Sequence, residues 1–336
     1  MDHDAYMYRA IELSKGGLGL TFPNPIVGAV LVSQFGEVIG EGFHAGGDHA
    51  EVAALKDCKT RGADPKGSTI YVSLEPCNHT GRTPPCTQSL LASGVSRVFY
   101  AVDDPNPLAQ GGAEYLKSQG VEIVAHLRKN EAAEVNRAWL HKMARNRPYF
   151  IWKIASTFDG FTAASDGSSQ WITSETSRTE AQQLRAESDA ILIGTGTALS
   201  DNPALIPRGH TRRPCRVVVG VRSVPRDFKL YDDEAPTLFL NTRDIDTILG
   251  RLIEMNFNQV LVESGSILGT ALLGAGLIDE ITWYQAPTIL GSGKPAIGEL
   301  GIERLDDRFD FTIVSSRRVG SDLCSTLRPK KAEEGK

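Results

Sequence analysis

Short apolar runs alternate with amphipathic segments along the first part of the chain. β-branched and apolar residues dominate 27–32, 68–74, 98–102 and 121–124, and this pattern predicts buried strands, with a shorter one at 38–39. Helical periodicity predicts helices at 6–15, 50–59, 88–92 and 112–119. Strands that alternate with helices in this order are typical of a layered α/β sheet.

A second α/β pattern follows a charged helical connector, Arg137–Arg147, that closes at Pro148. Strands are predicted at 149–154, 190–193, 216–219, 237–240, 259–262 and 280–284, and helices at 175–186, 245–255 and 267–275. We therefore predict one domain over residues 1–146 and another over 147–328. The remaining residues, 329–336, are nearly all charged or Gly, and we expect a disordered tail.

Composition supports two globular domains, because 336 residues exceed the size that one hydrophobic core usually serves. The formal net charge of −5 argues against a general nucleic-acid binder, since such domains are usually basic. No basic leader and no apolar stretch of about 20 residues is apparent, so neither a signal peptide nor a membrane span is expected. Five cysteines, an odd number, suit the reducing cytoplasm better than a disulfide framework.

Zinc chemistry is indicated by His49, Glu51, Cys77 and Cys86. Imidazole and thiolates are good zinc ligands, and three protein ligands leave a fourth position for water. Zinc deaminases that act on nucleobases carry an H-x-E…P-C-x-x-C signature whose Glu moves protons and does not bind the metal. We therefore expect His49, Cys77 and Cys86 to bind zinc and Glu51 to be catalytic, with His49 and Glu51 at the first turn of a helix.

The spacing of the two thiols departs from that signature, because eight residues and not two separate Cys77 from Cys86. An alternative is a closed structural zinc site in which Cys58 supplies the fourth ligand. That alternative leaves Glu51 without a role, so we favour the open catalytic site.

Two Gly-rich turns in the second half follow predicted strands, at 193–197 and at 262–269. Free backbone N–H groups at such strand-to-helix turns can bind phosphate. A G-x-G-x-x-G fingerprint is absent, and either turn alone reads equally well as a connector. Together they favour a dinucleotide site.

Several segments resemble the bifunctional riboflavin-biosynthesis deaminase-reductase family. They are Pro23–Val30, the His49–Glu51 box, Leu74–Cys86 and Asp104–Pro107 in the first half, and Ser156–Gly160, Ser169–Thr173 and Asp201–Pro203 in the second. The resemblance covers roughly residues 3 to 325. It implies a cytidine-deaminase-like three-layer α/β/α domain followed by a dihydrofolate-reductase-like α/β domain, with Zn²⁺ and NADPH as cofactors.

The same resemblance implies which residues contact the deaminase substrate. They are Asn24, His44, His79, Arg82, Asp104 and Asn106. His44 and His79 as additional metal ligands remain an alternative, and Asn24, between two prolines, reads equally well as a turn residue.

In the reductase half, the resemblance places one set of residues near the sugar phosphate and another near NADPH. The first set is Lys153, Ser169, Thr173, Arg185, Leu205, Arg208 and Glu263; the second is Ala155, Trp171, Thr197, Asp201, Gly265, Ser266, Ile267, Leu268, Gly269, Thr270 and Ala271. For Arg185 a solvated helix face is an equal alternative, and Asp201 fits a simple turn. Lys153 and Arg208 lie near segments whose sequence indicates a buried strand or a Gly-Pro turn, and a buried cation needs a partner, so we expect substrate phosphate, and not a structural ion pair, to compensate their charge.

The function implied is zinc-dependent hydrolytic deamination of a pyrimidine ribosyl phosphate, followed by NADPH-dependent reduction of its ribosyl group. The expected partner is this small molecule, without nucleic acid or membrane, and homo-oligomer formation stays open. Two competing hypotheses are a nucleoside- or RNA-editing deaminase with a fused binding domain, and a descendant in which one domain is only a scaffold. Intact His49, Glu51, Cys77 and Cys86 disfavour the scaffold hypothesis for the first half.

Overall fold

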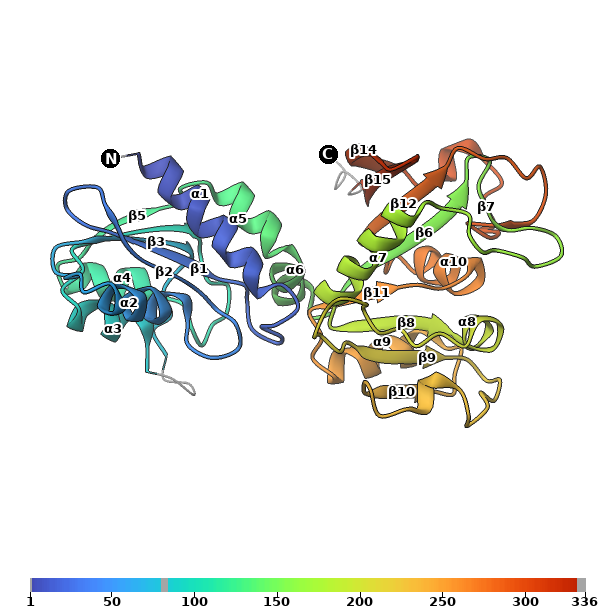
Figure 1. Cartoon of the computed structure of the whole chain (residues 1–336), viewed down its shortest axis with the longest axis horizontal. Helices are drawn as coiled ribbons and strands as arrows, with labels where there is room; N and C mark the ends of the chain where they lie inside the picture. Colours follow the sequence, from blue (N-terminus) through green and yellow to red (C-terminus); the bar gives the residue numbers. More distant parts are fainter. Residues whose placement is uncertain (1, 80–83, 331–336) are drawn as a thin grey trace. The chain divides into compact units, whose positions relative to one another are not determined.

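The computed structural model describes residues 2–79 and 84–330, and the chain divides after Asn146 into two compact α/β units (Figure 1). The first unit contains α1 (His3–Ser14), β1 (Gly28–Val32), β2 (Val38–Phe43), α2 (Ala50–Thr60), β3 (Thr69–Leu74), α3 (Cys86–Ala92), β4 (Arg97–Val102), α4 (Gly112–Ser118), β5 (Glu122–Ala125), α5 (Lys129–Val135) and α6 (Arg137–Arg145). The strands and helices expected in this part are confirmed; α5 was not predicted.

The sheet of the first unit has the strand order β2-β1-β3-β4-β5. β1 is antiparallel to both β2 and β3, whereas β3, β4 and β5 run parallel. Apolar side chains of α2, α3 and α4 pack on one face of the sheet, and those of α1, α5 and α6 pack on the other. The expected three-layer α/β/α fold is therefore confirmed.

The second unit contains the strands β6 (Tyr149–Thr157), β7 (Phe161–Ala163), β8 (Ala190–Gly194), β9 (Cys215–Val219), β10 (Thr237–Leu240), β11 (Gln259–Val262), β12 (Glu280–Ala286), β13 (Lys294–Pro295), β14 (Phe311–Val319) and β15 (Asp322–Pro329). Its helices are α7 (Glu175–Glu187), α8 (Thr195–Asp201), α9 (Ile245–Glu254) and α10 (Ser266–Gly274). The main sheet has the order β10-β9-β8-β11-β6-β12-β15-β14, and the strands from β10 to β12 run parallel.

The C-terminal hairpin of β14 and β15 was not predicted, because β14 carries consecutive polar residues and is exposed along most of its length. Pro329 pairs with Phe311 in this hairpin, and the backbone N–H of Lys330 donates to the carbonyl of Asp310. Both residues therefore belong to ordered structure and not to the expected tail, whose other residues, 331–336, lie outside the described part of the chain.

Parallel strands determine where a site can form in each unit. The carboxyl ends of β3 and β4 meet at one edge of the first sheet, and those of β6, β8 and β11 meet at one edge of the second. Ligands of open α/β sheets usually bind at this edge, where the loops and helix N-termini that follow the strands converge.

Candidate metal centre and substrate sites

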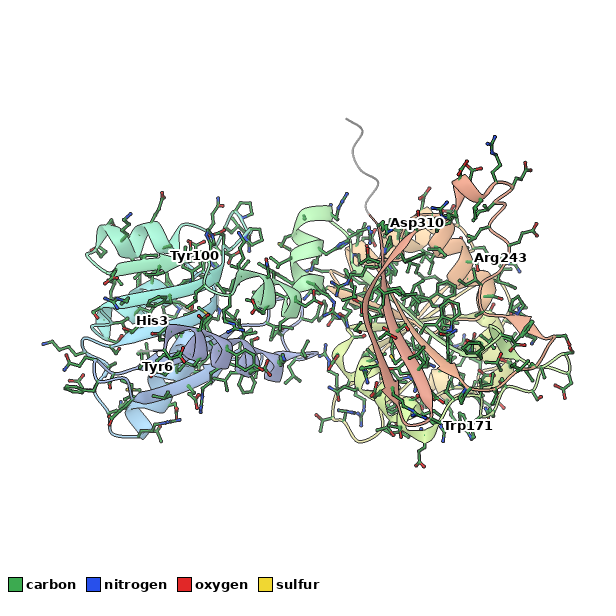
Figure 2. All side chains as sticks on the ribbon, turned by 90° about the horizontal axis from the view of Figure 1, so that it is seen from above. His3, Tyr6, Tyr100, Trp171, Arg243 and Asp310 are labelled. Carbon is green, nitrogen blue, oxygen red and sulfur yellow. The ribbon has the colours of Figure 1, made fainter. Side chains whose placement is uncertain are left out.

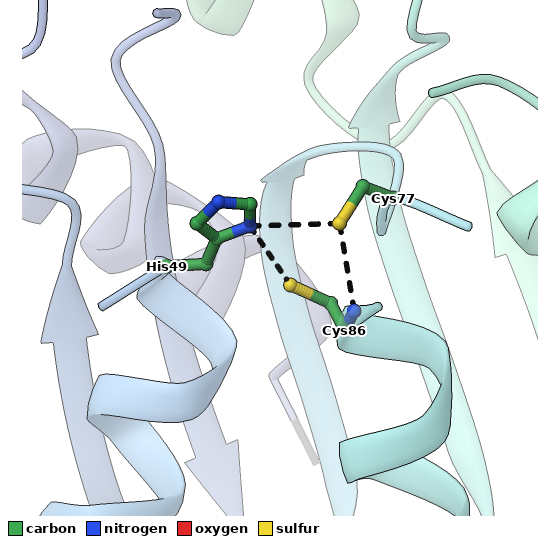
Figure 3. Close-up of side chains that lie close together, drawn as sticks. All are labelled: His49, Cys77 and Cys86. Atoms are coloured by element: carbon green, nitrogen blue, oxygen red, sulfur yellow. Dashed lines mark hydrogen bonds between the residues drawn. The ribbon is translucent and has the colours of Figure 1, made fainter. Parts of the chain in front are cut away.

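The zinc candidates come from three elements that converge at one edge of the first sheet (Figure 3). His49 is the N-cap residue of α2, Cys77 follows the end of β3, and Cys86 is the first residue of α3. Glycines let α2 approach the sheet closely: a Cβ built on Gly40 would lie 2.2 Å from the carbonyl oxygen of Ala54. The sequence of β2 therefore helps to place the N-terminus of α2, and His49 with it, beside the two thiols.

The three side chains have the geometry of a zinc site. Nδ1 of His49 lies 3.1 Å from Sγ of Cys86 and 3.5 Å from Sγ of Cys77, and the three ligand atoms lie within 4.8 Å of one another (Figure 3). Tetrahedral zinc with ordinary Zn–N and Zn–S bonds separates its ligand atoms by about 3.4–3.8 Å. The donor set therefore fits Zn²⁺, and small side-chain shifts bring the spacing of the three atoms to that of a tetrahedral site.

Burial and mutual contact give the two thiols different proton affinities. The thiol of Cys86 and the imidazole of His49 lower the pKa of Cys77, and the neighbouring Cys77 raises the pKa of Cys86. The pair therefore favours one thiolate even before metal binds, and thiolate is the form that ligates zinc.

Among the described residues, none of the alternative metal ligands belongs to this cluster. Sγ of Cys58 lies 3.5 Å from the carbonyl oxygen of Ala63, and Cys58 does not belong to the His49, Cys77 and Cys86 cluster. His44 and His79 do not belong to it either. The described part of the structure therefore gives the closed four-ligand site no support.

Glu51 lies in the first turn of α2, two residues after His49, and its side chain is only 3% exposed. Burial, together with the charge of Cys77, raises the pKa of Glu51 to about 7. A general acid–base catalyst works best with a pKa near the working pH, because it can then both accept and donate a proton. Its position beside the metal ligands and its proton affinity suit the expected proton shuttle.

The expected pyrimidine contacts lie on loops next to this centre. His44 is buried with its ring 5.5 Å from that of His49, and its Nδ1 lies 2.9 Å from the carbonyl oxygen of Asp48. Nε2 of His44 and Nδ1 of His79 are buried and have no hydrogen-bond partner within the described residues. Burial lowers the pKa of His44, so its imidazole is neutral; Nδ1–H donates to the carbonyl oxygen of Asp48, which leaves Nε2 as an acceptor for a ligand.

Two more predicted contacts share the loop after β4. Asp104 is buried, which raises its pKa to about 6, and it accepts a hydrogen bond from the backbone N–H of Asn106 at 2.8 Å.

Asn24 is exposed in a turn in which its N–H donates to the carbonyl oxygen of Thr21. The turn interpretation of Asn24 is therefore correct, and it leaves a side-chain contact with substrate open. Arg82 lies outside the described residues.

Glu75 is a residue of this site to which the sequence pattern assigned no role. Its buried carboxylate accepts hydrogen bonds from the N–H groups of Asp104 at 3.2 Å and Ala113 at 3.0 Å. It thus joins the loop that carries Cys77 to the loop that carries Asp104. An acidic residue directly between an apolar strand and Pro76-Cys77 was the available sequence signal.

In the second unit, three predicted charged residues lie near one another: Lys153 in the middle of β6, Glu263 directly after β11, and Arg185 on α7. Arg185 on α7 donates two hydrogen bonds to the carboxylate of Glu263, at 2.5 and 2.7 Å, and their side chains are 19% and 10% exposed. The solvated-face alternative for Arg185 is therefore wrong. Lys153 on β6 is within electrostatic range of both, and burial lowers its pKa.

The other predicted sugar-phosphate contacts differ in exposure. Thr173 is buried and Ser169 is exposed. Arg208 is exposed, so the expectation that its cation is buried was wrong; its chain is fixed by a hydrogen bond from its N–H to the side chain of Gln182. Leu205 packs its side chain in the core with Ile193, so a contact with substrate would have to use its main chain.

Most of the predicted NADPH contacts lie on the two helices that follow β8 and β11. Gly194 precedes α8, which contains Thr197 and Asp201, and Gly265 is the N-cap of α10, which contains Ser266–Ala271. β8 and β11 are neighbouring parallel strands, so both helix N-termini face the same edge. Gly-rich turns followed by helices leave backbone N–H groups free for phosphate.

Close packing explains Gly269, because a Cβ there would lie 2.1 Å from the ring of the buried Trp152. Ile267 is almost fully exposed, and Thr270 accepts a hydrogen bond from the N–H of Gly298. Ala155 lies on β6. Trp171 lies at the edge of the second unit (Figure 2), with the guanidinium of Arg178 4.7 Å from its ring centroid.

Comparison with known proteins identifies both halves. The RibD C-terminal domain matches residues 148–325, and the cytidine and deoxycytidylate deaminase zinc-binding region matches residues 1–102. The riboflavin biosynthesis protein RibD of Mycobacterium tuberculosis (strain ATCC 25618 / H37Rv) is 42% identical over 332 residues, which cover 96% of each chain. RibD of Escherichia coli (strain K12) is 37% identical and covers 97% of this chain and 99% of its own.

Solved structures agree over nearly the full length. The diaminohydroxyphosphoribosylaminopyrimidine deaminase/5-amino-6-(5-phosphoribosylamino)uracil reductase of Thermotoga maritima has a TM-score of 0.91 at 32% identity and covers 97% of this chain and 98% of its own. Acinetobacter baumannii RibD has a TM-score of 0.88 at 35% identity and covers 98% and 99%. A deaminase with an unrelated fused binding domain is thereby disfavoured. The chain belongs to the RibD family of riboflavin biosynthesis, bifunctional enzymes that join a zinc-dependent deaminase domain to an NADPH-dependent reductase domain.

Proposed function

We propose that the first domain hydrolytically removes a ring amine from the diaminopyrimidine ribosylamino phosphate, and that the second reduces the ribosyl group of the product to ribityl with NADPH. The deaminase/reductase of Thermotoga maritima is named for these compounds. The observation that carries the proposal is the buried Glu51, with a pKa of about 7, beside a His-Cys-Cys set of zinc geometry. We place the enzyme in the cytosol, where Cys77 and Cys86 stay reduced. Among the described residues, no helix is long and apolar enough to cross a membrane.

In the deaminase, His49, Cys77 and Cys86 would hold the metal, which when bound acts as a Lewis acid and lowers the pKa of water. Glu51 takes a proton from the attacking water and returns it to the ring nitrogen and to the departing ammonia. Asn24, His44, His79, Asp104 and Asn106 would orient the pyrimidine, together with Arg82.

In the reductase, Lys153 is the residue best placed to meet a phosphate or sugar oxygen. Lys153 is partly buried, burial lowers its pKa, and its ammonium group makes no hydrogen bond or ion pair with any described residue, although Glu263 lies near it. Burying a cation is costly unless a partner compensates it, and an anionic substrate supplies that partner. Ser169, Thr173, Arg185, Arg208 and Glu263, with the main chain of Leu205, would complete the substrate site. Ala155, Trp171, Thr197, Asp201 and Gly265–Ala271 would bind NADPH.

The test of the proposed chemistry is Glu51→Gln in the full chain. We expect normal zinc content and ammonia release slowed by about 10²–10⁴-fold, because a positioned acid–base group contributes that much. NADPH oxidation with substrate that is already deaminated should be unchanged and is the internal control for folding. Near-normal ammonia release from the zinc-loaded variant would contradict the role of Glu51.

A further inference from the structure

Asn136 lies at the junction of α5 and α6 and is only 2% exposed. Its carboxamide makes two hydrogen bonds to one residue that is 110 positions away in the sequence. The backbone N–H of Ile26 donates to Oδ1 of Asn136 at 2.8 Å, and Nδ2 of Asn136 donates to the carbonyl oxygen of Ile26. One side chain thus satisfies both backbone groups of a partly buried loop residue.

The position of Asn136 in its own helix makes this contact informative. Asn136 is the N-cap residue of α6, where an Asn side chain usually accepts a hydrogen bond from the first turn and stabilises the helix by about 0.5–2 kcal/mol. The side chain makes no such bond here. The carboxamide therefore serves the Ile26 segment in place of its own helix.

The segment around Ile26 carries one residue of the proposed pyrimidine site, Asn24, and is hydrogen-bonded to another, His44. Ile26 lies two residues after Asn24, and the turn before it is closed by hydrogen bonds between Thr21 and Asn24. On the other side of Ile26, the carbonyl oxygen of Val27 accepts a hydrogen bond from the N–H of His44 at 2.9 Å. Asn136 is thus the anchor between the turn that presents Asn24 and the backbone that holds His44.

We propose that Asn136 is a positioning residue of the deaminase, which fixes the segment 24–27 and through it the side chain of Asn24 at the pyrimidine. The inference rests on the proposed function of Asn24. It extends the deaminase site to α5 and α6, beyond residues 1–102, which match the zinc-binding region of deaminases. The helix before the domain boundary is then part of the catalytic unit and more than a tether.

The test compares Asn136→Ala, Asn24→Ala and the double variant in the full chain. For Asn136→Ala we expect KM for the deaminase substrate to rise about tenfold or more, with a smaller fall in kcat and unchanged zinc content. If Asn136 acts through Asn24, the double variant should have the KM of Asn24→Ala alone, because coupled residues are not additive. NADPH oxidation with deaminated substrate should stay normal.

Ser96→Ala is the matched control. Ser96 also makes two side-chain hydrogen bonds to backbone, to the carbonyls of Gly67 and Ser68, but at the opposite edge of the same sheet. It should leave KM unchanged. If Asn136→Ala lowers the melting temperature too far for kinetics, Asn136→Asp keeps the acceptor for the Ile26 N–H, and its KM should lie between those of the wild type and Asn24→Ala.

Different outcomes overturn different claims. Normal KM in Asn136→Ala, together with raised KM in Asn24→Ala, would overturn the positioning role alone. Normal KM in Asn24→Ala would overturn the proposed contact of Asn24, and this inference with it. If the two KM effects multiply in the double variant, Asn136 does not act through Asn24.

Discussion

Replacing Glu263 by Gln tests whether the buried pair with Arg185 stabilises the reductase domain. The carboxylate now accepts two hydrogen bonds from the guanidinium, at 2.5 and 2.7 Å, and both side chains are largely removed from solvent. Gln has nearly the same shape but no charge. The variant therefore leaves the cations of Arg185 and Lys153 buried without their shared counter-charge.

The expected loss is large because removing one partner of a buried ion pair typically costs about 3–5 kcal/mol. For a domain of this size, each 1 kcal/mol shifts the melting temperature by about 2–4 °C. We therefore expect the melting transition of the reductase domain to fall by roughly 6–20 °C at neutral pH.

The effect should depend on pH in a defined direction. Burial alone would raise the pKa of Glu263, but the charge and hydrogen bonds of Arg185 hold it below its ordinary value of 4.5. A depressed folded-state pKa contributes stability that is present above the unfolded value and is lost as pH falls through the folded value. The difference in stability between wild type and Glu263→Gln should therefore be full above about pH 4.5 and shrink on further acidification.

Thermal melts of the full chain, followed together with NADPH oxidation, provide the assay. Asp306→Asn is the control, because Asp306 and Arg304 form an exposed pair at 3.9 Å and should contribute little. An unchanged melting temperature for Glu263→Gln would refute the electrostatic argument. The double variant Arg185→Leu/Glu263→Leu removes the ion pair and should recover part of the stability, because only Lys153 is then left without its counter-charge. If this double variant also reduces substrate normally, the proposed substrate role of the pair is wrong.

Two further predictions concern residues whose surroundings are now known. Cys86→Ser should lose most of its zinc by metal analysis, whereas Cys58→Ser should retain it, because only Cys86 lies with His49 and Cys77; equal loss in both would restore the closed-site alternative. Arg208→Ala should weaken use of the reductase substrate without changing the melting temperature or NADPH affinity, since its exposed side chain makes no ion pair with any described residue; a lower melting temperature with normal kinetics would contradict this.

The zinc centre could be predicted from the sequence because its ligands and its catalytic Glu lie in short segments with a recognisable residue pattern. His49 and Glu51 lie close together at a helix start, and Cys77 comes three residues after a strand whose apolar sequence indicates burial. The residue types alone specify the metal, and the position of a strand end specifies the edge of the sheet. The layered fold was predictable for the same reason, because the spacing of apolar residues along the sequence differs between strands and helices.

Contacts between distant residues were not predictable in this way. Arg185 and Glu263 are 78 positions apart in the sequence. An Arg on a helix is compatible with exposure to solvent as well as with a buried ion pair, so the sequence did not distinguish the two. For Arg208, nearby apolar and turn residues suggested burial, yet the fold leaves this side chain at the surface. The C-terminal hairpin escaped prediction because its exposed strand β14 lacks the alternation that a half-buried strand shows.

Glu75 and Asn136 show why a motif alone does not specify a working site. Neither residue is a metal ligand of the motif, yet each bonds two backbone groups: Glu75 accepts from the N–H of Asp104 and from that of Ala113 in the first turn of α4, and Asn136 bonds both backbone groups of Ile26. Loops that follow strands have few regular hydrogen bonds of their own, so their shape depends on side chains supplied from elsewhere in the fold. A positioned site needs such supports to hold its contacting groups to within a fraction of an ångström. In this chain the supports are Glu75, two residues before Cys77, and Asn136, at the start of the helix before the domain boundary, so we expect the deaminase to depend on a longer part of the chain than its ligand motif spans.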